Sequence, residues 1–190
     1  MEVELKNPDI RKLKDMEDVL LNKEVAKSNP EQEIYYMYRG LKEENGLRYD
    51  ITVIPPFLMG EEYVKTKGHF HCADYGEIYT VIKGEAVFLM QKGKEAIEDI
   101  YAVKAKAGQS VIIPSGYAHV TINASNETLE LANWVSVECT SDYDTIKEKN
   151  GAGYFYTTKG WIKNTNYKNI PEMRFEEPLK EVPENLDFLK

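Results

Sequence analysis

The residues with the clearest capacity for chemistry are the three histidines of this 190-residue chain, together with one glutamate. His69 and His71 flank a phenylalanine. Side chains two apart on a strand point to one face, so both imidazoles are expected in the same space. Glu77 opens the next predicted strand after a short turn, and we expect it beside the histidine pair across a hairpin. His119 begins a strand after a Pro-Ser-Gly turn.

Three imidazoles and one carboxylate are a donor set typical of a site for a first-row divalent metal. Iron(II), manganese, zinc and nickel accept such ligands, whereas calcium and magnesium prefer oxygen alone. We therefore predict a metal held by His69, His71, Glu77 and His119, with iron(II) as the first candidate. The alternative is that these are core or surface histidines placed by chance. The metal is favoured because two separate segments supply the expected ligand types and because every histidine of the chain belongs to the set.

Two other side chains lie near this set in the sequence, Tyr79 and Cys72. Tyr79 lies two residues after Glu77 on the same predicted strand and is expected to face the same cavity. It is a candidate catalytic residue, although many inward tyrosines only fill a core. Cys72 is expected to face away from the metal as a packed thiol. With only two cysteines in the chain, reduced thiols are expected.

Short apolar or alternating runs, each closed by Gly, Pro or Asn, must position these residues. The spacing predicts an antiparallel β-sandwich or barrel, because no helical segments of crossover length separate the runs. The predicted strands cover residues 33–39, 48–54, 62–71, 77–82, 86–91, 97–103, 110–113, 119–123 and 129–138. A short helix is expected within 9–24 and a helical turn at 144–150. The proline-containing tail is expected to be an extended arm.

Composition limits the classes of partner. The formal net charge of -8 argues against general nucleic-acid binding, which depends on neutralising phosphates with Lys and Arg. The first residues are charged, and no stretch approaches the length of a membrane span. We therefore expect a cytoplasmic protein with no membrane and no nucleic acid among its partners.

The two histidine blocks resemble the paired signatures of the cupins. The second, residues 108–123, keeps every fixed position, whereas the first has five residues between His71 and Glu77 where many cupins have three or four. More narrowly, Thr-Lys-Gly-His-Phe-His at residues 66–71 with a downstream Glu-x-Tyr resembles the cupin-type glucose-6-phosphate isomerases known mainly from archaea. The likeness extends over roughly residues 11–151.

This resemblance implies an all-β fold, a single cupin (jelly-roll) β-barrel, as one domain over residues 1–190. Its core barrel would span about 33–140, with an N-terminal segment at 1–32 and a C-terminal arm at 155–190. It implies a metal-dependent isomerase that interconverts glucose 6-phosphate and fructose 6-phosphate in glycolysis and gluconeogenesis, acting as a homodimer. A base such as Glu77 could pass a proton through a cis-enediol, or the metal could assist a hydride shift; the resemblance leaves both routes open.

The resemblance also implies a phosphate-binding set. Thr66, Lys67 and the Gly68 amide lie just before the metal strand, where a hydroxyl, a cation and an uncrowded N–H can hold phosphate oxygens. Lys65 is expected to add positive charge. Thr52 matches a threonine that contacts phosphate in the family, although it is equally readable as an ordinary β-branched strand residue.

Two positions depart from the family pattern. Ser141 and Val135 stand where the archaeal enzymes carry a histidine and a tyrosine that contact the sugar phosphate. Trp134, Tyr154 or Tyr156 are candidates to compensate. The departures keep two alternatives open: an isomerase or epimerase of another sugar phosphate such as mannose 6-phosphate, and a non-catalytic sugar-phosphate-binding cupin. A third alternative, a cupin dioxygenase, stays open because three histidines and a glutamate around iron also describe that class.

Overall fold

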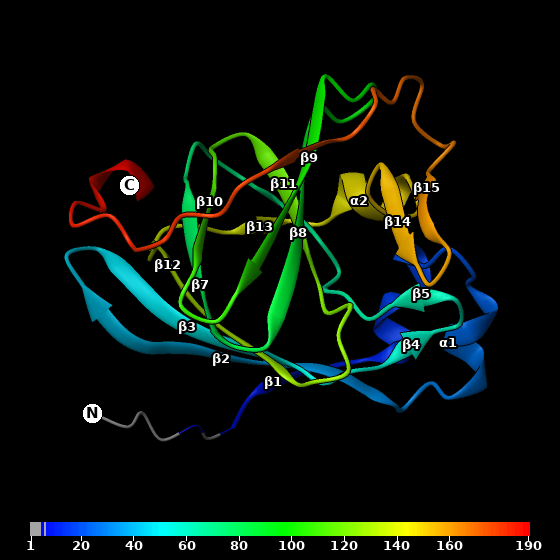
Figure 1. Cartoon of the computed structure of the whole chain (residues 1–190), viewed down its shortest axis with the longest axis horizontal. Coiled ribbons are helices and arrows are strands. Elements are labelled where there is room, and N and C mark those ends of the chain that lie inside the picture. The colour runs from blue at the N-terminus through cyan, green and yellow to red at the C-terminus, as the bar shows by residue number, and fades with distance from the viewer. Residues whose placement is uncertain (1–4, 6) are drawn as a thin grey trace.

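The computed structural model describes residues 5 and 7–190 and forms a β-barrel closed by two sheets (Figure 1). The charged start of the chain, residues 1–4 and 6, lies outside this part. The larger sheet has the order β1-β2-β3-β12-β7-β10 and comprises Asp9–Lys12, Glu33–Glu44, Leu47–Ile54, Leu129–Ser136, Glu77–Lys83 and Ser110–Ile113. The second has the order β11-β8-β9-β16 and comprises Tyr117–Ile122, Glu85–Lys92, Asp99–Lys106 and Arg174–Glu176. The expected all-β barrel is confirmed.

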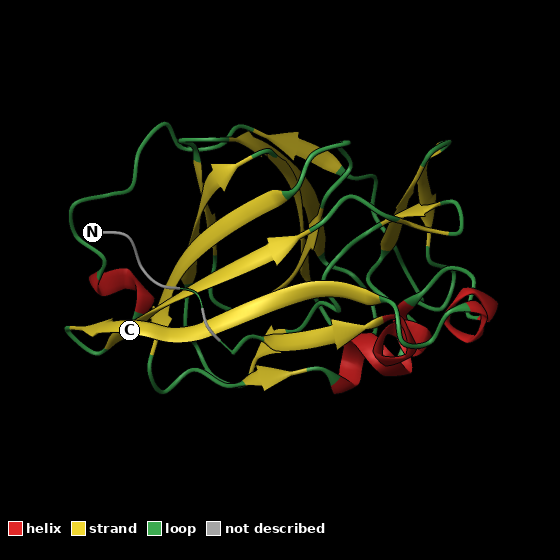
Figure 2. Ribbon diagram, turned by 90° about the horizontal axis from the view of Figure 1, so that it is seen from below, coloured by secondary structure: helices red, strands yellow, loops and turns green. Residues whose placement is uncertain are grey.

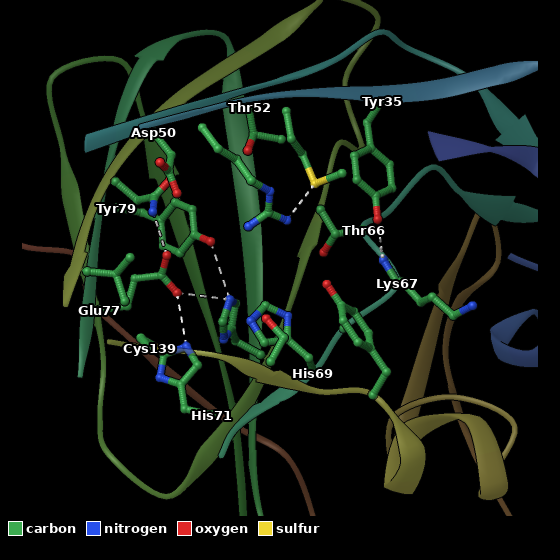
Figure 3. Close-up of a pocket in the computed structure, with 18 of the residues that line it drawn as sticks. Tyr35, Asp50, Thr52, Thr66, Lys67, His69, His71, Glu77, Tyr79 and Cys139 are labelled. Carbon is green, nitrogen blue, oxygen red and sulfur yellow. Dashed lines mark hydrogen bonds and ion pairs between the residues drawn. The ribbon is translucent and has the colours of Figure 1, made fainter. Parts of the chain in front are cut away.

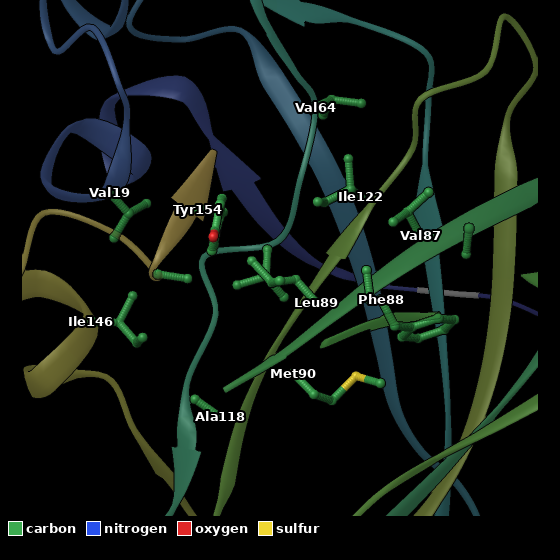
Figure 4. Packing of buried hydrophobic residues seen from close by; sticks show 14 of the residues in the cluster. Val19, Val64, Val87, Phe88, Leu89, Met90, Ala118, Ile122, Ile146 and Tyr154 are labelled. Atoms are coloured by element: carbon green, nitrogen blue, oxygen red, sulfur yellow. The ribbon is translucent and has the colours of Figure 1, made fainter. Parts of the chain in front are cut away.

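Strand pairing is antiparallel throughout these two sheets except where β16 runs parallel to β9. β8 is buried along almost its whole length, so its two faces both pack against other elements. Phe88 faces the barrel interior, where its ring lies 5.4 Å from that of Tyr79. Leu89, which points the opposite way, belongs to a cluster with Val19, Ile146 and Tyr154 outside the barrel (Figure 4). The core therefore continues beyond the barrel wall.

The N-terminal segment differs from the single helix expected within residues 9–24. Residues 9–12 form β1, which lengthens the sheet by pairing with β2. A 3-10 helix, η1 (Leu13–Val19), follows, and its buried residues Leu13, Met16 and Val19 recur every third position. That period matches three residues per turn, which explains why a 3-10 helix forms here. The α-helix α1 comes later, at Glu24–Ser28.

The predicted strand over residues 62–71 is broken in the middle. Glu62–Tyr63 forms β5, which pairs with β4 (Leu58–Met59), and Phe70–His71 forms β6, which pairs with β13 (Ser141–Asp142). Gly68 has φ of +79°, and a Cβ there would lie 2.6 Å from a methyl carbon of Val120. Only glycine fits this turn of the backbone, and it interrupts the strand just before His69.

The C-terminal region is only partly the extended arm that was expected from residue 155. Tyr154–Thr157 and Gly160–Lys163 form a hairpin, β14–β15, which pairs with β5. Gly160 adopts φ of +108° at its turn, and the rings of Tyr156 and Trp161 stack 4.2 Å apart. From residue 164 onward the chain does run along the barrel, contributing β16 and then η2 (Asp187–Leu189).

The helices lie at the ends of the barrel. η1, α1 and α2 (Asp144–Glu148) gather at the end that carries the β14–β15 hairpin, and η2 lies at the other (Figure 2). None of the helices in the described residues is long and apolar enough to cross a membrane.

Candidate active site

The three histidines and Glu77 converge inside the barrel. Each offers one ligand atom, and these four atoms lie within 4.8 Å of one another. His69 and His119 face each other as backbone partners: the His119 N–H donates to the His69 carbonyl at 3.1 Å. His71 ends β6 and Glu77 begins β7. The structure therefore brings the four predicted ligands together (Figure 3).

The expected route by which Glu77 reaches the histidines is wrong. β6 and β7 are not partners in a hairpin, because β6 pairs with β13 while β7 lies between β12 and β10. The turn of five residues between His71 and Glu77 carries the chain from one pairing to the other. Glu77 thus faces the histidines across the cavity, from the opposite wall.

Hydrogen bonds to neighbouring groups orient the candidate ligands. His71 Nδ1 lies 2.8 Å from the Tyr75 carbonyl, to which it donates, so Nε2 is the nitrogen that carries the lone pair once the ring is neutral. This Nε2 lies 3.3 Å from Glu77 Oε2, and His119 Nε2 lies 3.4 Å from the same oxygen. The other Glu77 oxygen, Oε1, accepts a 2.6 Å hydrogen bond from Asn133 Nδ2. Such partners are what fix metal-ligating groups in place.

The electrostatics of the three imidazoles differ. Burial, with His71, Arg39 and Arg48 nearby, lowers the pKa of His69 to about 3. Burial and the neighbouring His69 also lower the pKa of His119 well below its ordinary value. Burial opposes the charge on His71 as well, but hydrogen bonding to Cys139 and Glu77 outweighs it and raises its pKa to about 10. At neutral pH two imidazoles are neutral donors, while the third holds a proton beside Glu77.

This arrangement fits a divalent cation. Two neutral imidazoles, a third that shares its proton with a carboxylate, and that carboxylate itself form a nitrogen-rich set preferred by first-row metals. Within the described residues the buried Nδ1 of His119 has no hydrogen-bond partner, and an orphaned buried ring nitrogen fits a histidine in a ligand site better than an ordinary core histidine. A metal at this set would be bound by His69, His71, Glu77 and His119.

The predicted phosphate residues line the same pocket. Thr52, Thr66, Lys67 and Gly68 all face it. The Thr66 hydroxyl oxygen accepts the Thr121 N–H at 3.0 Å, and the Lys67 ammonium donates to the Asp15 carbonyl at 2.6 Å. Burial, with Arg11 and Lys147 nearby, lowers the pKa of Lys67. Two of these groups are therefore fixed by the fold before any ligand arrives.

Lys65 and Cys72 do not lie where the sequence indicated. The Lys65 ammonium is buried in an ion pair with Glu62 and also donates to the Val19 carbonyl at 2.8 Å, so it brings no free charge to the pocket. Cys72 is exposed rather than packed, and the other cysteine, Cys139, is buried and lines the pocket.

Further pocket residues escaped the sequence analysis although alternation on the strands could have found them. Side chains two apart on β2, β3 and β12 all face the pocket; besides Val135, already named as a departure from the family pattern, they are Tyr35, Met37, Arg39, Arg48, Asp50 and Asn133. They form two rungs across β3, β12 and β7. One rung is Arg48, Val135 and Glu77, and the other is Asp50, Asn133 and Tyr79.

The two departures from the family pattern both lie in the pocket. Val135 and Ser141 line it, as does Tyr143. The proposed substitutes lie elsewhere. Trp134 packs against Tyr49 at 5.0 Å between ring centroids, while Tyr154 and Tyr156 belong to the hairpin beyond the barrel. Val135 is smaller than the tyrosine of the family pattern, and its cross-strand neighbour Arg48 lines the pocket beside it.

Comparison with known proteins places this geometry in context. The family model described as glucose-6-phosphate isomerase matches residues 10–172. The glucose-6-phosphate isomerase of Pyrococcus horikoshii is 30% identical over 169 residues, covering 84% of this chain and 88% of that protein. The enzyme of the same name from Thermococcus kodakarensis is 31% identical and covers 81% and 82% of the two chains. Since the match spans both the barrel and the pocket, the chain belongs to the glucose-6-phosphate isomerase family.

Proposed function

We propose that this pocket interconverts glucose 6-phosphate and fructose 6-phosphate with one divalent metal held by His69, His71, Glu77 and His119. The observation that carries the proposal is a single pocket with two chemically different ends. One end is the ligand tetrad, and the other is lined by Thr52, Thr66, Lys67 and Gly68. An open-chain sugar phosphate has the matching pair of groups, a carbonyl at one end and a phosphate at the other.

The orientation of the substrate follows from this pairing. The phosphate lies against the Thr66 hydroxyl, the Gly68 amide and the Lys67 ammonium, which together offer neutral and charged donors. Tyr35, whose hydroxyl accepts the Lys67 N–H at 3.2 Å, stands at the same end. C1 and C2 then lie at the tetrad, where a bound divalent ion would act as a Lewis acid on their oxygens.

Tyr79 is proposed as the proton relay between those oxygens. Its hydroxyl lies 3.3 Å from His119 Nε2, inside the tetrad end of the pocket. Burial and the Glu77 carboxylate raise its pKa well above the ordinary value of 10, so it stays protonated at neutral pH. A neutral hydroxyl can give a proton to the C1 oxygen and take one from the C2 hydroxyl without leaving a charge behind.

Glu77 is better placed as a ligand than as a base. Its Oε1 accepts the Asn133 hydrogen bond, and its Oε2 faces the two imidazole nitrogens. A carboxylate with both oxygens engaged has little freedom to take the C2 hydrogen as a proton. We therefore favour direct transfer of the C2 hydrogen to C1 over a cis-enediol. Turnover in deuterium oxide tests this: retention of protium in the product supports direct transfer, and substantial deuterium at the transferred position contradicts it.

Iron(II) is proposed as the resident metal, with manganese, zinc or nickel as substitutes, and a homodimer as the assembly. The nitrogen-rich donor set supports the choice of metal. Elemental analysis of purified protein and its mass in solution test the two proposals separately.

The function itself is tested with metal-loaded protein and a panel of sugar phosphates. A coupled assay is expected to show turnover of glucose 6-phosphate, with mannose 6-phosphate as the matched stereoisomer. Turnover of mannose 6-phosphate at a much higher kcat/KM would reassign the substrate. Absence of turnover with all four metals would remove the isomerase proposal.

A further inference from the structure

A second hollow adjoins the phosphate end of the pocket. Arg11, Lys67, Tyr143 and Lys147 line it, and its volume is about 140 Å³. Arg11 comes from β1, Lys67 from the segment before His69, Tyr143 from the position just before α2, and Lys147 from α2 itself. Lys67 and Tyr143 also line the main pocket, so they form a wall between the two hollows.

Three of the four lining residues are cations, on a chain whose formal net charge is -8. Within the described residues the buried Arg11 Nε has no hydrogen-bond partner, although the guanidinium lies beside the Tyr35 hydroxyl. Within residues 5 and 7–190, Lys147 takes part in none of the ion pairs, whereas Lys149, two residues later, pairs with Glu95 at 2.9 Å. Asp15 approaches, but its carboxylate accepts the Lys12 N–H and its carbonyl accepts the Lys67 ammonium. Asp15, and Asp18 beside Lys67, only partly offset the three cations, and the unpaired buried donor of Arg11 is costly.

We propose that Arg11, Lys67 and Lys147 form a second oxyanion position that binds a phosphate ion alongside the sugar phosphate. The main pocket already supplies a place for the one phosphate of a hexose phosphate, at Thr66 and Gly68. The assignment of that inner position rests on the proposed function. The isomerisation does not require the outer position. Its ligand is a free inorganic phosphate or an equivalent small oxyanion.

Simultaneous binding has a measurable consequence. Two anions on either side of Lys67 repel each other, so phosphate in the outer position weakens binding of the sugar phosphate by a fixed factor. Phosphate also competes with the substrate for the inner position, so the apparent KM rises with phosphate concentration in any case, and occupation of the outer position adds to that rise. If only the inner position existed, the apparent KM would rise linearly with phosphate concentration, and equally in a variant changed only at the outer hollow.

Lys147 is the residue to change, since it is exposed and lines only the outer hollow. Lys147→Gln should fold normally, and Lys149→Gln removes an equal charge from the same segment outside the hollow. Metal-loaded wild-type protein and both variants are assayed with phosphate at constant ionic strength. We expect the same rise of the apparent KM with phosphate for the wild type and for Lys149→Gln. In Lys147→Gln, the part of the rise that comes from the outer position should need at least about fivefold more phosphate, as for loss of one charge-assisted contact.

Calorimetry tests phosphate binding without requiring turnover. Inorganic phosphate is titrated into the metal-loaded protein saturated with glucose 6-phosphate, where the expected result is one phosphate bound per chain. Absence of phosphate binding to the saturated protein would overturn the proposal, as would equal effects of the two lysine substitutions. If glucose 6-phosphate itself does not bind, the proposed function fails. The outer position is then judged by whether Lys147→Gln alone weakens phosphate binding to the unsaturated protein.

Discussion

The two ends of the pocket are built in different ways. At the tetrad end, the ligands come from the strands or flank them, and groups behind them such as Asn133 and the Tyr75 carbonyl hold them in place. At the phosphate end, Thr66, Lys67 and Gly68 belong to a segment between two short strands, with the turn at Gly68 preventing any larger residue. The first end is arranged for fixed coordination geometry. The second offers hydrogen-bond donors that a phosphate can meet in several ways, so substitutions at the tetrad end should lower kcat and those at the phosphate end should raise KM.

The largest effect is expected from His119→Ala. Removing one of the four ligands should release the metal, and loss of Lewis-acid assistance worth several kcal/mol should lower kcat by at least about 10³-fold. Elemental analysis and the coupled assay measure the two effects. Metal-stripped wild-type protein is the matched control, and it should be equally inactive. Full activity of the variant would break the assignment of the tetrad end.

Tyr79→Phe should lower kcat by roughly 10²-fold, the usual contribution of a positioned proton donor, with KM and metal content little changed. Tyr101→Phe, the same substitution on β9 outside the pocket, should have no effect on turnover. A change confined to KM would move Tyr79 from proton relay to substrate binding.

The affinity of the protein for its metal should increase about tenfold per pH unit between pH 7 and 9. His71, with its pKa raised to about 10 in the metal-free protein, must release a proton before it can bind the ion, so affinity increases as pH rises. Competition titrations with manganese at pH 7 and pH 8 would measure the difference. Equal affinity at both values would show that His71 is already neutral.

A related prediction concerns stability of the metal-free protein at low pH. The pKa of His69 falls from about 6.5 to about 3 on folding, so the unfolded chain binds the proton more readily between these values. The free energy of unfolding should therefore fall as pH is lowered from 6.5 toward 3. Denaturant titrations across that window check the direction. Constant stability there would indicate that His69 is solvated.

The smallest effect is expected from Thr52→Val, which keeps the shape and removes one hydroxyl. Loss of a single phosphate contact worth about 1 kcal/mol should raise KM by roughly fivefold with kcat unchanged. Thr158→Val, at the exposed β14–β15 turn, provides the control. If kcat fell and KM did not change, the division of labour between the two ends would be wrong.

The sequence predicted the tetrad better than its surroundings. The four ligands could be identified because the chain has only three histidines and their spacing fits strand alternation. Asn133 and Arg48 could not be placed, because their relation to Glu77 depends on β12 lying between β3 and β7. That order joins residues far apart in the chain. The barrel could be predicted from the runs of strand-like residues, but not which run pairs with which.

Local errors had local causes. The strand over residues 62–71 was predicted unbroken since its residues alternate, yet Gly68 needs a positive φ that ends the pairing. The hairpin at residues 154–163 was predicted as part of an arm, although Gly160 and the aromatic pair on either side of its turn favour paired strands. In both segments a glycine indicated a turn, but the prediction followed the overall composition of the segment instead.

The central claim is that one metal ion at His69, His71, Glu77 and His119 gives this pocket its activity. Stepwise addition of iron(II) or manganese to metal-stripped protein, with turnover of glucose 6-phosphate and bound metal measured at each step, tests it most directly. Turnover should rise in proportion to bound metal and level off at one ion per chain. Turnover that is already complete in the stripped protein, or that rises only with a second ion, would contradict it.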